Sequence, residues 1–305
     1  MSRTLRGFIL VIAASMMTGC CLIDDNPVVS GPNFLGPDDF VGSFDGLDAP
    51  IPMGGQSNFT GDIAVTHLKR TVVDDILPED LKLAANTAGD PDHPVIVLFG
   101  VQHNLQWVYP GGWALPIEKI YNEIMLIVPF VQKDDGDKWH NWVARMYLDW
   151  DWAVNMGNTL FGLQKESGVF DRTLVGSSAL TYTLDVSRNN NPKWAGEVTD
   201  LTGWMSDGVA EANLPNYPAI KQIFSMPILG RMSLIASDPY VCSYFDWNMS
   251  NGQARGDKIK HEFLSNFRPN MDAWVNLGGL ESQQNGGFGV KDLQWRMTTA
   301  MPCNF

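Results

Sequence analysis

The stretch that decides the fold is Tyr121-Asn122-Glu123-Ile124-Met125-Leu126-Ile127-Val128-Pro129-Phe130-Val131. An apolar run follows its single carboxylate, from Ile124 through Phe130, which favours a buried strand over residues 120–131. The strand is expected to end at Pro129 or just after, because proline cannot donate a ladder hydrogen bond. The acids at 134, 135 and 137 then form a solvated hairpin turn rather than a calcium loop, since their spacing lacks the ligands of such a loop.

Short strands separated by Gly- and Pro-rich turns make up most of the remaining pattern. Helices are predicted over 72–83, 150–158 (capped by Asp149) and 257–267 (capped by Asp257). Extended segments are predicted over 63–70, 95–101, 143–148, 173–186, 194–201, 221–224, 232–237 and 290–299. One mainly β domain over residues 58–305, after a lead-in over 20–57, accounts for this pattern.

The N-terminal residues resemble the export signal of a bacterial lipoprotein. Arg3 and Arg6 precede a short apolar run, and Met17-Thr18-Gly19-Cys20 resembles the lipobox at which the cysteine is lipidated. The sequence thus predicts a signal peptide over 1–19 and a lipid on Cys20. With Cys21 after it in place of Asp, the expected location is the bacterial cell envelope, on the periplasmic face of the outer membrane. The alternative is a plain secretory signal, with Cys20 and Cys21 as ordinary thiols.

The composition restricts the class of partner. The chain has a formal net charge of −13, and residues 1–19 hold two arginines and no acid, so their removal gives −15. Such a surface repels phosphate backbones, so nucleic acid is not expected as a partner. Hydrophobic residues make up 45%, with 29 glycines and 18 prolines, which indicates a globular, loop-rich β protein. The partners that remain are the membrane, through the lipid, and a small molecule.

Several kinds of catalytic site lack their motif in this sequence. It contains no nucleophile elbow, no P-loop and no dinucleotide-binding fingerprint. No metal site is expected, because the histidines fall in no metal-ligand spacing: His67, His93, His103, His140 and His261. Cys242 and Cys303 either pair as a disulfide in an oxidising compartment or remain two buried thiols.

Several local patterns occur in an order that resembles the acetoacetate decarboxylase superfamily. Tyr121-Asn122-Glu123 is similar to the family's Tyr-x-Glu strand, and Tyr147-Leu148-Asp149 to its Tyr-x-Asp strand end. The segment 157–165, ending in Lys165, is similar to the helix end and bend that carry the family's reactive lysine. Weaker matches are Ile76 to Leu81, Thr173 to Gly176, Leu214 to Tyr217 with Lys221, and Gly230-Arg231.

The resemblance implies an antiparallel, cone-like β-barrel with a few short helices and a buried pocket. In this family the lysine matched by Lys165 forms a Schiff base with a carbonyl substrate, and Glu123 matches the pocket carboxylate. A lysine near its usual pKa of about 10.4 is protonated at neutral pH, so the family lowers that pKa. The implied function is a lyase acting on a keto acid or related carbonyl compound. No cofactor is expected, and the family's rings of protomers imply a homo-oligomer.

The sequence also departs from the family pattern. The residue after the reactive lysine is Glu166 instead of a second lysine, and a carboxylate beside Lys165 would raise the pKa of the amine. Gly157-Asn158-Thr159 replaces Gly-Arg-Glu, Gln164 replaces the bend proline, and no arginine lies near Phe59. Two alternatives therefore stand beside the enzyme: an envelope lipoprotein that binds an apolar or carbonyl-bearing small molecule without reacting, and a scaffold without a ligand. The Lys165-Glu166 pair separates the enzyme from the binder, since an enzyme must point Glu166 away or pair it with a cation.

Overall fold

The computed structural model describes residues 41–42, 53–85, 91–110, 114–175, 179–185, 192–199, 217–232, 239–248, 252–264, 267–268, 277, 280–281, 287–303 and 305. The predicted signal peptide, Cys20, Cys21 and most of the predicted lead-in lie outside these residues, as does most of the segment 232–237. Within the described part of the chain, no helix is long and apolar enough to span a bilayer.

The elements are mostly strands. Three helices are described: α2 (Arg70–Asp75), α3 (Asp151–Leu160) and α5 (Tyr217–Phe224). The strands are β1 (Val41–Gly42), β2 (Gly54–Lys69), β3 (Leu81–Leu83), β4 (Asp92–Val108), β5 (Ala114–Ile117), β6 (Tyr121–Lys133), β7 (His140–Leu148), β8 (Lys165–Ser167), β9 (Val169–Val175), β10 (Ala179–Asp185), β11 (Pro192–Thr199), β12 (Ile228–Arg231), β13 (Tyr240–Ser243), β14 (Phe245–Asn248), β15 (Gln253–Phe263), β16 (Leu280–Glu281), β17 (Gly287–Thr298) and β18 (Met301–Pro302).

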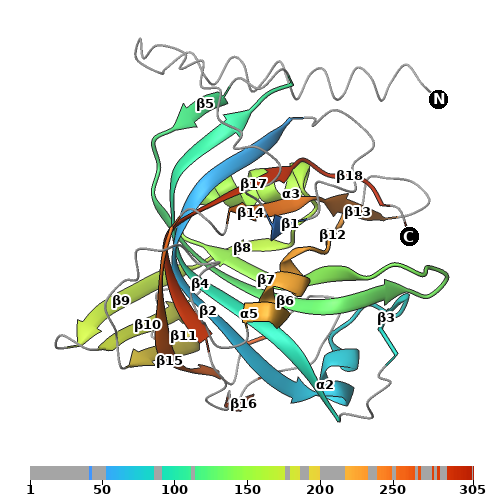
Figure 1. The fold of residues 1–305 in the computed structure, drawn as a ribbon, viewed down its shortest axis with the longest axis horizontal. Coiled ribbons are helices and arrows are strands. Elements are labelled where there is room, and N and C mark those ends of the chain that lie inside the picture. Colours follow the sequence, from blue (N-terminus) through green and yellow to red (C-terminus); the bar gives the residue numbers. More distant parts are fainter. Residues whose placement is uncertain are drawn as a thin grey trace.

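A curled, largely antiparallel sheet forms the body of the molecule (Figure 1). Its long strands pair in the order β17–β2–β4–β6–β7. The short strands continue from β7 through β12 and β13 to β18, which follows β17 in the chain. A second group of strands, β9, β10 and β11, projects to one side and joins the body through β15, which pairs with β17 and then with β11. The mainly β architecture predicted from the sequence is confirmed.

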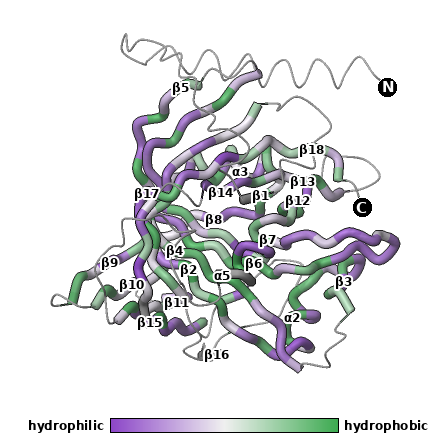
Figure 2. Tube along the Cα trace, in the orientation of Figure 1, coloured by the Kyte–Doolittle hydropathy of each residue, from purple (hydrophilic) through white to green (hydrophobic). Residues whose placement is uncertain are grey.

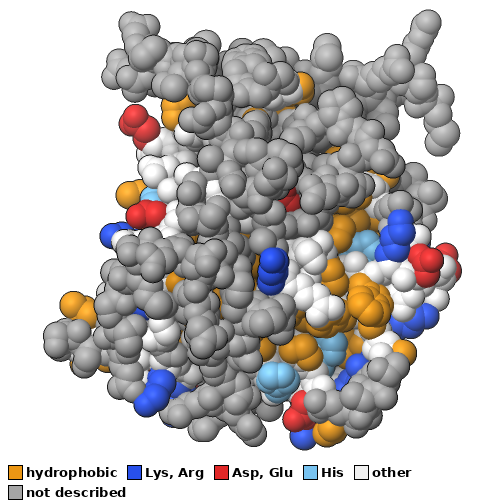
Figure 3. Space-filling view, viewed as in Figure 1, with side chains coloured by type: hydrophobic (Ala, Val, Ile, Leu, Met, Phe, Trp, Pro, Cys, Tyr) orange, Lys and Arg blue, Asp and Glu red, His pale blue; other side chains and the backbone are white. Residues whose placement is uncertain are grey.

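Two apolar cores lie on opposite faces of the curled sheet, because successive strand residues point to opposite sides. The α2 core contains Val97, Phe99 and Tyr147, together with side chains of α2 and of the projecting strands. The α5 core contains Met125, Met146 and the buried side chains of α3 and α5. Figure 2 shows that hydrophobic residues occupy the middle of the long strands and hydrophilic residues their turns. In Figure 3, acidic and basic side chains gather at the tip of the β6–β7 hairpin.

Two predicted elements were wrong. Residues 257–267 were expected as a helix, but strand β15 runs to Phe263, with Ile259 and Phe263 buried and Lys260 exposed in the alternation of a strand. Residues 221–224, expected as extended, form the end of α5, where Ile220, Ile223 and Phe224 are buried at helical spacing.

The other corrections concern element ends. The helix expected over 72–83 ends at Asp75, and Leu81–Leu83 pairs with β6 as strand β3. Strand β2 begins at Gly54, so residues 54–57, expected in the lead-in, already belong to the sheet. The strand expected over 120–131 runs on to Lys133, and Phe130, at a register shift in this strand, takes a positive φ of 57°.

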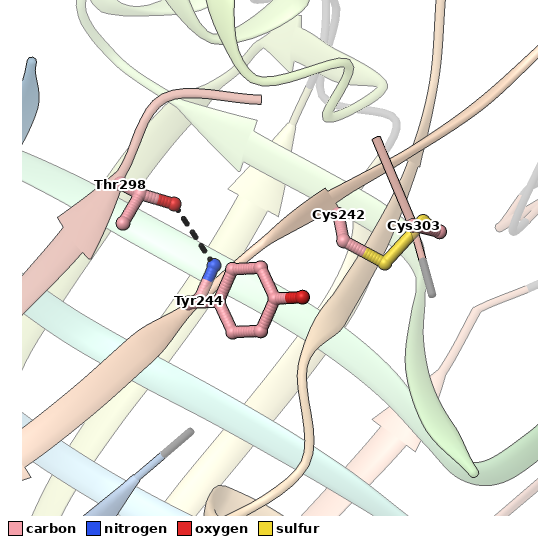
Figure 4. Close-up of a disulfide and its surroundings, with 4 residues drawn as sticks. All are labelled: Cys242, Tyr244, Thr298 and Cys303. Atoms are coloured by element: carbon pink, nitrogen blue, oxygen red, sulfur yellow. Dashed lines mark hydrogen bonds between the residues drawn. A yellow bond between two sulfur atoms is a disulfide. The ribbon is translucent and has the colours of Figure 1, made fainter. Parts of the chain in front are cut away.

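The C-terminal residues are held to the sheet by a covalent bridge. Cys242 and Cys303, whose pairing the sequence left open, form a disulfide across 61 residues. Beside it the Tyr244 backbone N–H donates to Oγ1 of Thr298 at 3.1 Å (Figure 4). The bridge lies at the β13–β18 pair and keeps the short strands closed against β17.

Removal of this bridge should destabilise the fold. A closed loop of this length corresponds to about 4 kcal/mol of lost chain entropy in the unfolded state. We expect Cys242→Ala/Cys303→Ala to lower the free energy of unfolding in urea by about 3 to 4 kcal/mol. A reductant should lower the stability of the wild type equally and leave the double variant unchanged; equal stability of wild type and variant would contradict the assignment.

Candidate functional site

The candidate site forms where the start of β6 meets the end of β7. The Asp149 carboxylate accepts hydrogen bonds from the Asn122 backbone N–H at 2.8 Å and from its side-chain amide at 2.6 Å. Asp149 was expected to cap the following helix, but the N-cap residue is Trp150, without a side-chain cap bond. Asp149 instead fixes the register in which Glu123 pairs with Leu148. Both side chains therefore belong to the face of the α5 core.

The bend after α3 presents Lys165 to the same face. The helix ends at Leu160, and Gly162 adopts a positive φ of 63° that turns the chain back. The Asn158 side chain then holds the Lys165 backbone at both groups: its Oδ1 accepts from the N–H at 2.6 Å, and its Nδ2 donates to the carbonyl at 3.0 Å. Strand β8 begins there, parallel to β7, with Lys165 in register with Met146 of the α5 core.

Gly157 of α3 provides the space for the Lys165 side chain. A Cβ on Gly157 would lie 2.3 Å from both Cδ and Cε of Lys165. The lysine chain therefore packs directly on the helix backbone, where any larger residue would displace it. This close approach accounts for a glycine within a helix, a position at which glycine costs about 1 kcal/mol relative to alanine.

Glu123 and Lys165 form a mutually interacting pair, in which the glutamate is fully buried and the lysine half-buried. Glu123 is 2% exposed, and burial raises the pKa of its carboxyl, an effect that Lys165 and a hydrogen bond from Gln102 partly oppose. Burial lowers the pKa of the Lys165 amine, and the negative charge of Glu123 partly opposes that shift. The lowered pKa increases the fraction of neutral amine near pH 7, which is the form that attacks a carbonyl.

A hydrogen-bond chain orients the carboxylate. Gln102 Nε2 donates to Oε1 of Glu123 at 3.1 Å, and the Trp295 indole N–H donates to Oε1 of Gln102 at 2.8 Å. The Trp295 ring stacks on Phe245 at 5.0 Å between centroids. Gln102 is 3% exposed, so both ends of its amide are fixed within the protein.

Glu166 lies on the opposite face of the sheet from Lys165. It is in register with Tyr147, which belongs to the α2 core. There its carboxylate forms an ion pair with Arg145, whose Nε also donates to the Tyr147 hydroxyl at 3.1 Å. Arg145 and Tyr147 are two residues apart on β7, so strand alternation places this buried arginine on the face of Tyr147. Glu166 is thus both turned away from Lys165 and paired with a cation.

The remaining sequence candidates lie elsewhere. Among the described residues, no group of three or more His, Cys, Asp or Glu is placed to bind a metal ion. Phe59, where the family pattern would have an arginine, is fully buried in the α5 core and in edge contact with Trp247. The roles of Gln102, Arg145 and Trp295 could not be recognised in the sequence, because they depend on strand register and no local motif marks them. Asn158 lies within the motif segment 157–165, where it stood as a departure from the family pattern, and its hydrogen bonds to Lys165 were not foreseen.

Comparison with known proteins identifies the fold. No family model and no curated protein matches the sequence. Among solved structures, acetoacetate decarboxylase from Legionella pneumophila matches with a TM-score of 0.50 at 12% identity, covering 83% of this chain and 90% of its own. The chain has the acetoacetate decarboxylase-like fold.

Two further structures of this fold match equally well. Another acetoacetate decarboxylase matches with a TM-score of 0.50 at 15% identity, covering 85% of this chain and 94% of its own. The enduracididine biosynthesis enzyme MppR, solved with the condensation product of pyruvate and imidazole 4-carboxaldehyde, matches with a TM-score of 0.50 at 13% identity, covering 90% of this chain and 96% of its own. The superfamily fold expected from the sequence motifs is thereby confirmed.

The geometry predicts different effects for two neighbouring carboxylates. Glu123→Gln removes the negative charge that holds the Lys165 ammonium, so the pKa of Lys165 should fall further. The pH midpoint for reaction of Lys165 with an amine-selective reagent should therefore move to lower pH. Glu166→Gln is the matched control and should leave that midpoint unchanged, because Glu166 lies across the sheet. Peptide mapping of protein labelled between pH 6 and 11 measures the midpoint in both variants. A shift of the Lys165 midpoint that is larger in Glu166→Gln than in Glu123→Gln would contradict the assignment of the two carboxylates to opposite faces.

Proposed function

We propose that this protein is a Schiff-base enzyme of the acetoacetate decarboxylase type, in which Lys165 reacts with a carbonyl substrate and Glu123 transfers protons. The observation that supports the proposal is the interaction of the half-buried Lys165 with the buried Glu123, while Glu166 lies on the other face of the sheet. A carboxylate beside the Schiff-base lysine would raise the pKa of the amine and oppose its reaction. Glu166 pairs instead with Arg145 on the other face of the sheet, which supports the proposal.

The chemistry requires only groups that the site holds. The neutral Nζ of Lys165 adds to the carbonyl carbon, and the former carbonyl oxygen leaves as water after it has gained two protons, one from the amine and one from an acid. Glu123 is suited to deliver the second proton because burial raises the pKa of its carboxyl. The product is a protonated imine, a cation beside the Glu123 carboxylate.

The protonated imine accepts the electron pair of a neighbouring bond. In a keto acid the bond to the carboxylate carbon breaks, carbon dioxide leaves, and the electron pair forms an enamine, which is then protonated. Other bonds beside the imine can break in the same way, so aldol cleavage and dehydration are related reactions. The relative solved with a condensation product of pyruvate supports this range for the fold.

Borohydride trapping tests the proposal. The full chain, purified in a non-ionic detergent, is incubated with a panel of keto acids, ketones and aldehydes, reduced, and mapped by mass spectrometry. A secondary-amine adduct at Lys165 is expected, and Lys165→Arg should remove it.

Gly157→Ala supplies a variant that separates reactivity from folding. Its methyl group displaces the end of a flexible side chain and improves helix propensity by about 1 kcal/mol, so stability should be retained while the adduct at Lys165 is strongly reduced. Absence of any Lys165 adduct up to pH 9, in wild-type protein with a cooperative unfolding transition, would contradict the enzyme and leave a protein that binds without reacting.

A further inference from the structure

We propose that the substrate is an uncharged aldehyde or ketone with an apolar substituent, and that a keto acid is excluded by its carboxylate. The inference rests on the proposed function of Lys165 and names the substrate class of that site. Three observations carry it: the charge balance of the site, the places that the buried arginines occupy, and the apolar side chains around the reacting amine.

The site is electrically balanced without a substrate carboxylate. Once the imine forms, its single positive charge on Lys165 is matched by the single negative charge of Glu123. A keto acid would add a second negative charge to the same buried volume. Burying a charge without a partner is strongly unfavourable, so this carboxylate would need a cation of its own.

The buried arginines among the described residues all lie on the face of the sheet opposite to Lys165, where each forms an ion pair with a carboxylate. Arg145 pairs with Glu166, Arg255 with Asp62 at 3.4 Å, and Arg296 with Asp246 at 3.0 Å. Arg255 and Arg296 adjoin Ala254 and Trp295, which point into the α5 core, so by strand alternation the arginines point away from it.

In the described part of the chain, the charged group that shifts the pKa of Glu123 is Lys165, and the one that shifts the pKa of Lys165 is Glu123. Beyond residue 53, the segments that the structure leaves undescribed contain one basic residue in sequence, Arg188. The face that bears Lys165 therefore offers little that could hold a substrate carboxylate.

Apolar groups surround the reacting amine. Met146 is in register with Lys165 and Met125 with Met146, so a row of thioether side chains leads away from the amine along this face. Met125 also lines a small cavity of about 10 Å³, together with Ile127, Asn141, Phe224, Met226, Ile228, Phe245 and Trp247. Met125 and Met226 are unbranched and can shift to admit an apolar substituent.

A chain of side-chain contacts connects the cavity to the Glu123 carboxylate. Phe245 lines the cavity and stacks on Trp295, which donates to Gln102, which in turn donates to Glu123. Glu123 and Met125 are two residues apart on the same face of β6, and Met146 lies between Met125 and Lys165 in the sheet. A substrate whose carbonyl carbon lies at Lys165 would therefore meet one carboxylate and two apolar methionine side chains, which favours an apolar substituent over a second carboxylate.

An uncharged ketone still has a reaction open to it. In its imine, the C–H bond beside the imine carbon breaks, Glu123 takes the proton, the bonding pair forms a C=C bond, and the imine π pair returns to nitrogen. The result is a neutral enamine and a protonated Glu123. Return of a deuteron from D2O completes an exchange without any co-reactant.

Matched pairs of carbonyl compounds test the inference. The full chain in detergent is trapped with borohydride in the presence of acetoacetate or its methyl ester, and of 4-oxopentanoate or 2-pentanone. Each yield at Lys165 is divided by the yield on Nα-acetyl-lysine amide, which removes differences in intrinsic reactivity. We expect at least about a tenfold preference for the uncharged member of each pair, and Glu123→Gln should reduce that preference.

Deuterium exchange into 2-pentanone, followed by NMR, gives a second readout. Exchange should depend on both Lys165 and Glu123 and should persist in Glu166→Gln. Equal or better trapping of the acids at Lys165 would overturn the inference and leave the proposed function standing. Absence of a Lys165 adduct with all four compounds would overturn both.

Discussion

The candidate site depends on the alternation of side chains along the three residues of β8. Because neighbouring strand residues point to opposite faces, Lys165 enters the α5 core and Glu166 the α2 core, where Arg145 meets it. A slip of one residue would exchange these two side chains. The Glu166 carboxylate would then lie on the face of the α5 core, beside the methionine side chains. The Lys165 amine would lie beside the buried Arg145. Register at β8 therefore decides which of the two side chains lies on the same face as Glu123.

Several contacts maintain that register. Asn158 holds both backbone polar groups of Lys165, and Asp149 ties the end of β7 to the start of β6. Gly157 leaves room for the lysine chain against α3. These residues touch no reacting atom, but they define where the amine lies. The disulfide, at the C-terminal edge of the same sheet, closes the short strands that follow β7.

Sequence reasoning reached the fold class because apolar runs and turn residues are local signals. It also proposed Lys165 and Glu123, through motifs whose spacing resembles a family. The sequence could not show whether Glu166 lies beside the Lys165 amine. Glu166 pairs with Arg145, which is twenty-one positions earlier in the sequence and is brought to it by the pairing of β7 with β8. The helix predicted over 257–267 failed for a related reason: pairing with β11 and β17 outweighed local propensity in a segment whose alternation already favoured a strand.

The pKa of the Lys165 amine tests the central claim most directly. Protein containing lysine labelled with ¹³C at Cε can be titrated by NMR from pH 5 to 11, with the Lys165 resonance assigned from Lys165→Arg. The account predicts a midpoint below the usual value of about 10.4, because burial of the amine outweighs the charge of Glu123. A midpoint at or above that value would show a solvated or ion-paired ammonium and would contradict the account.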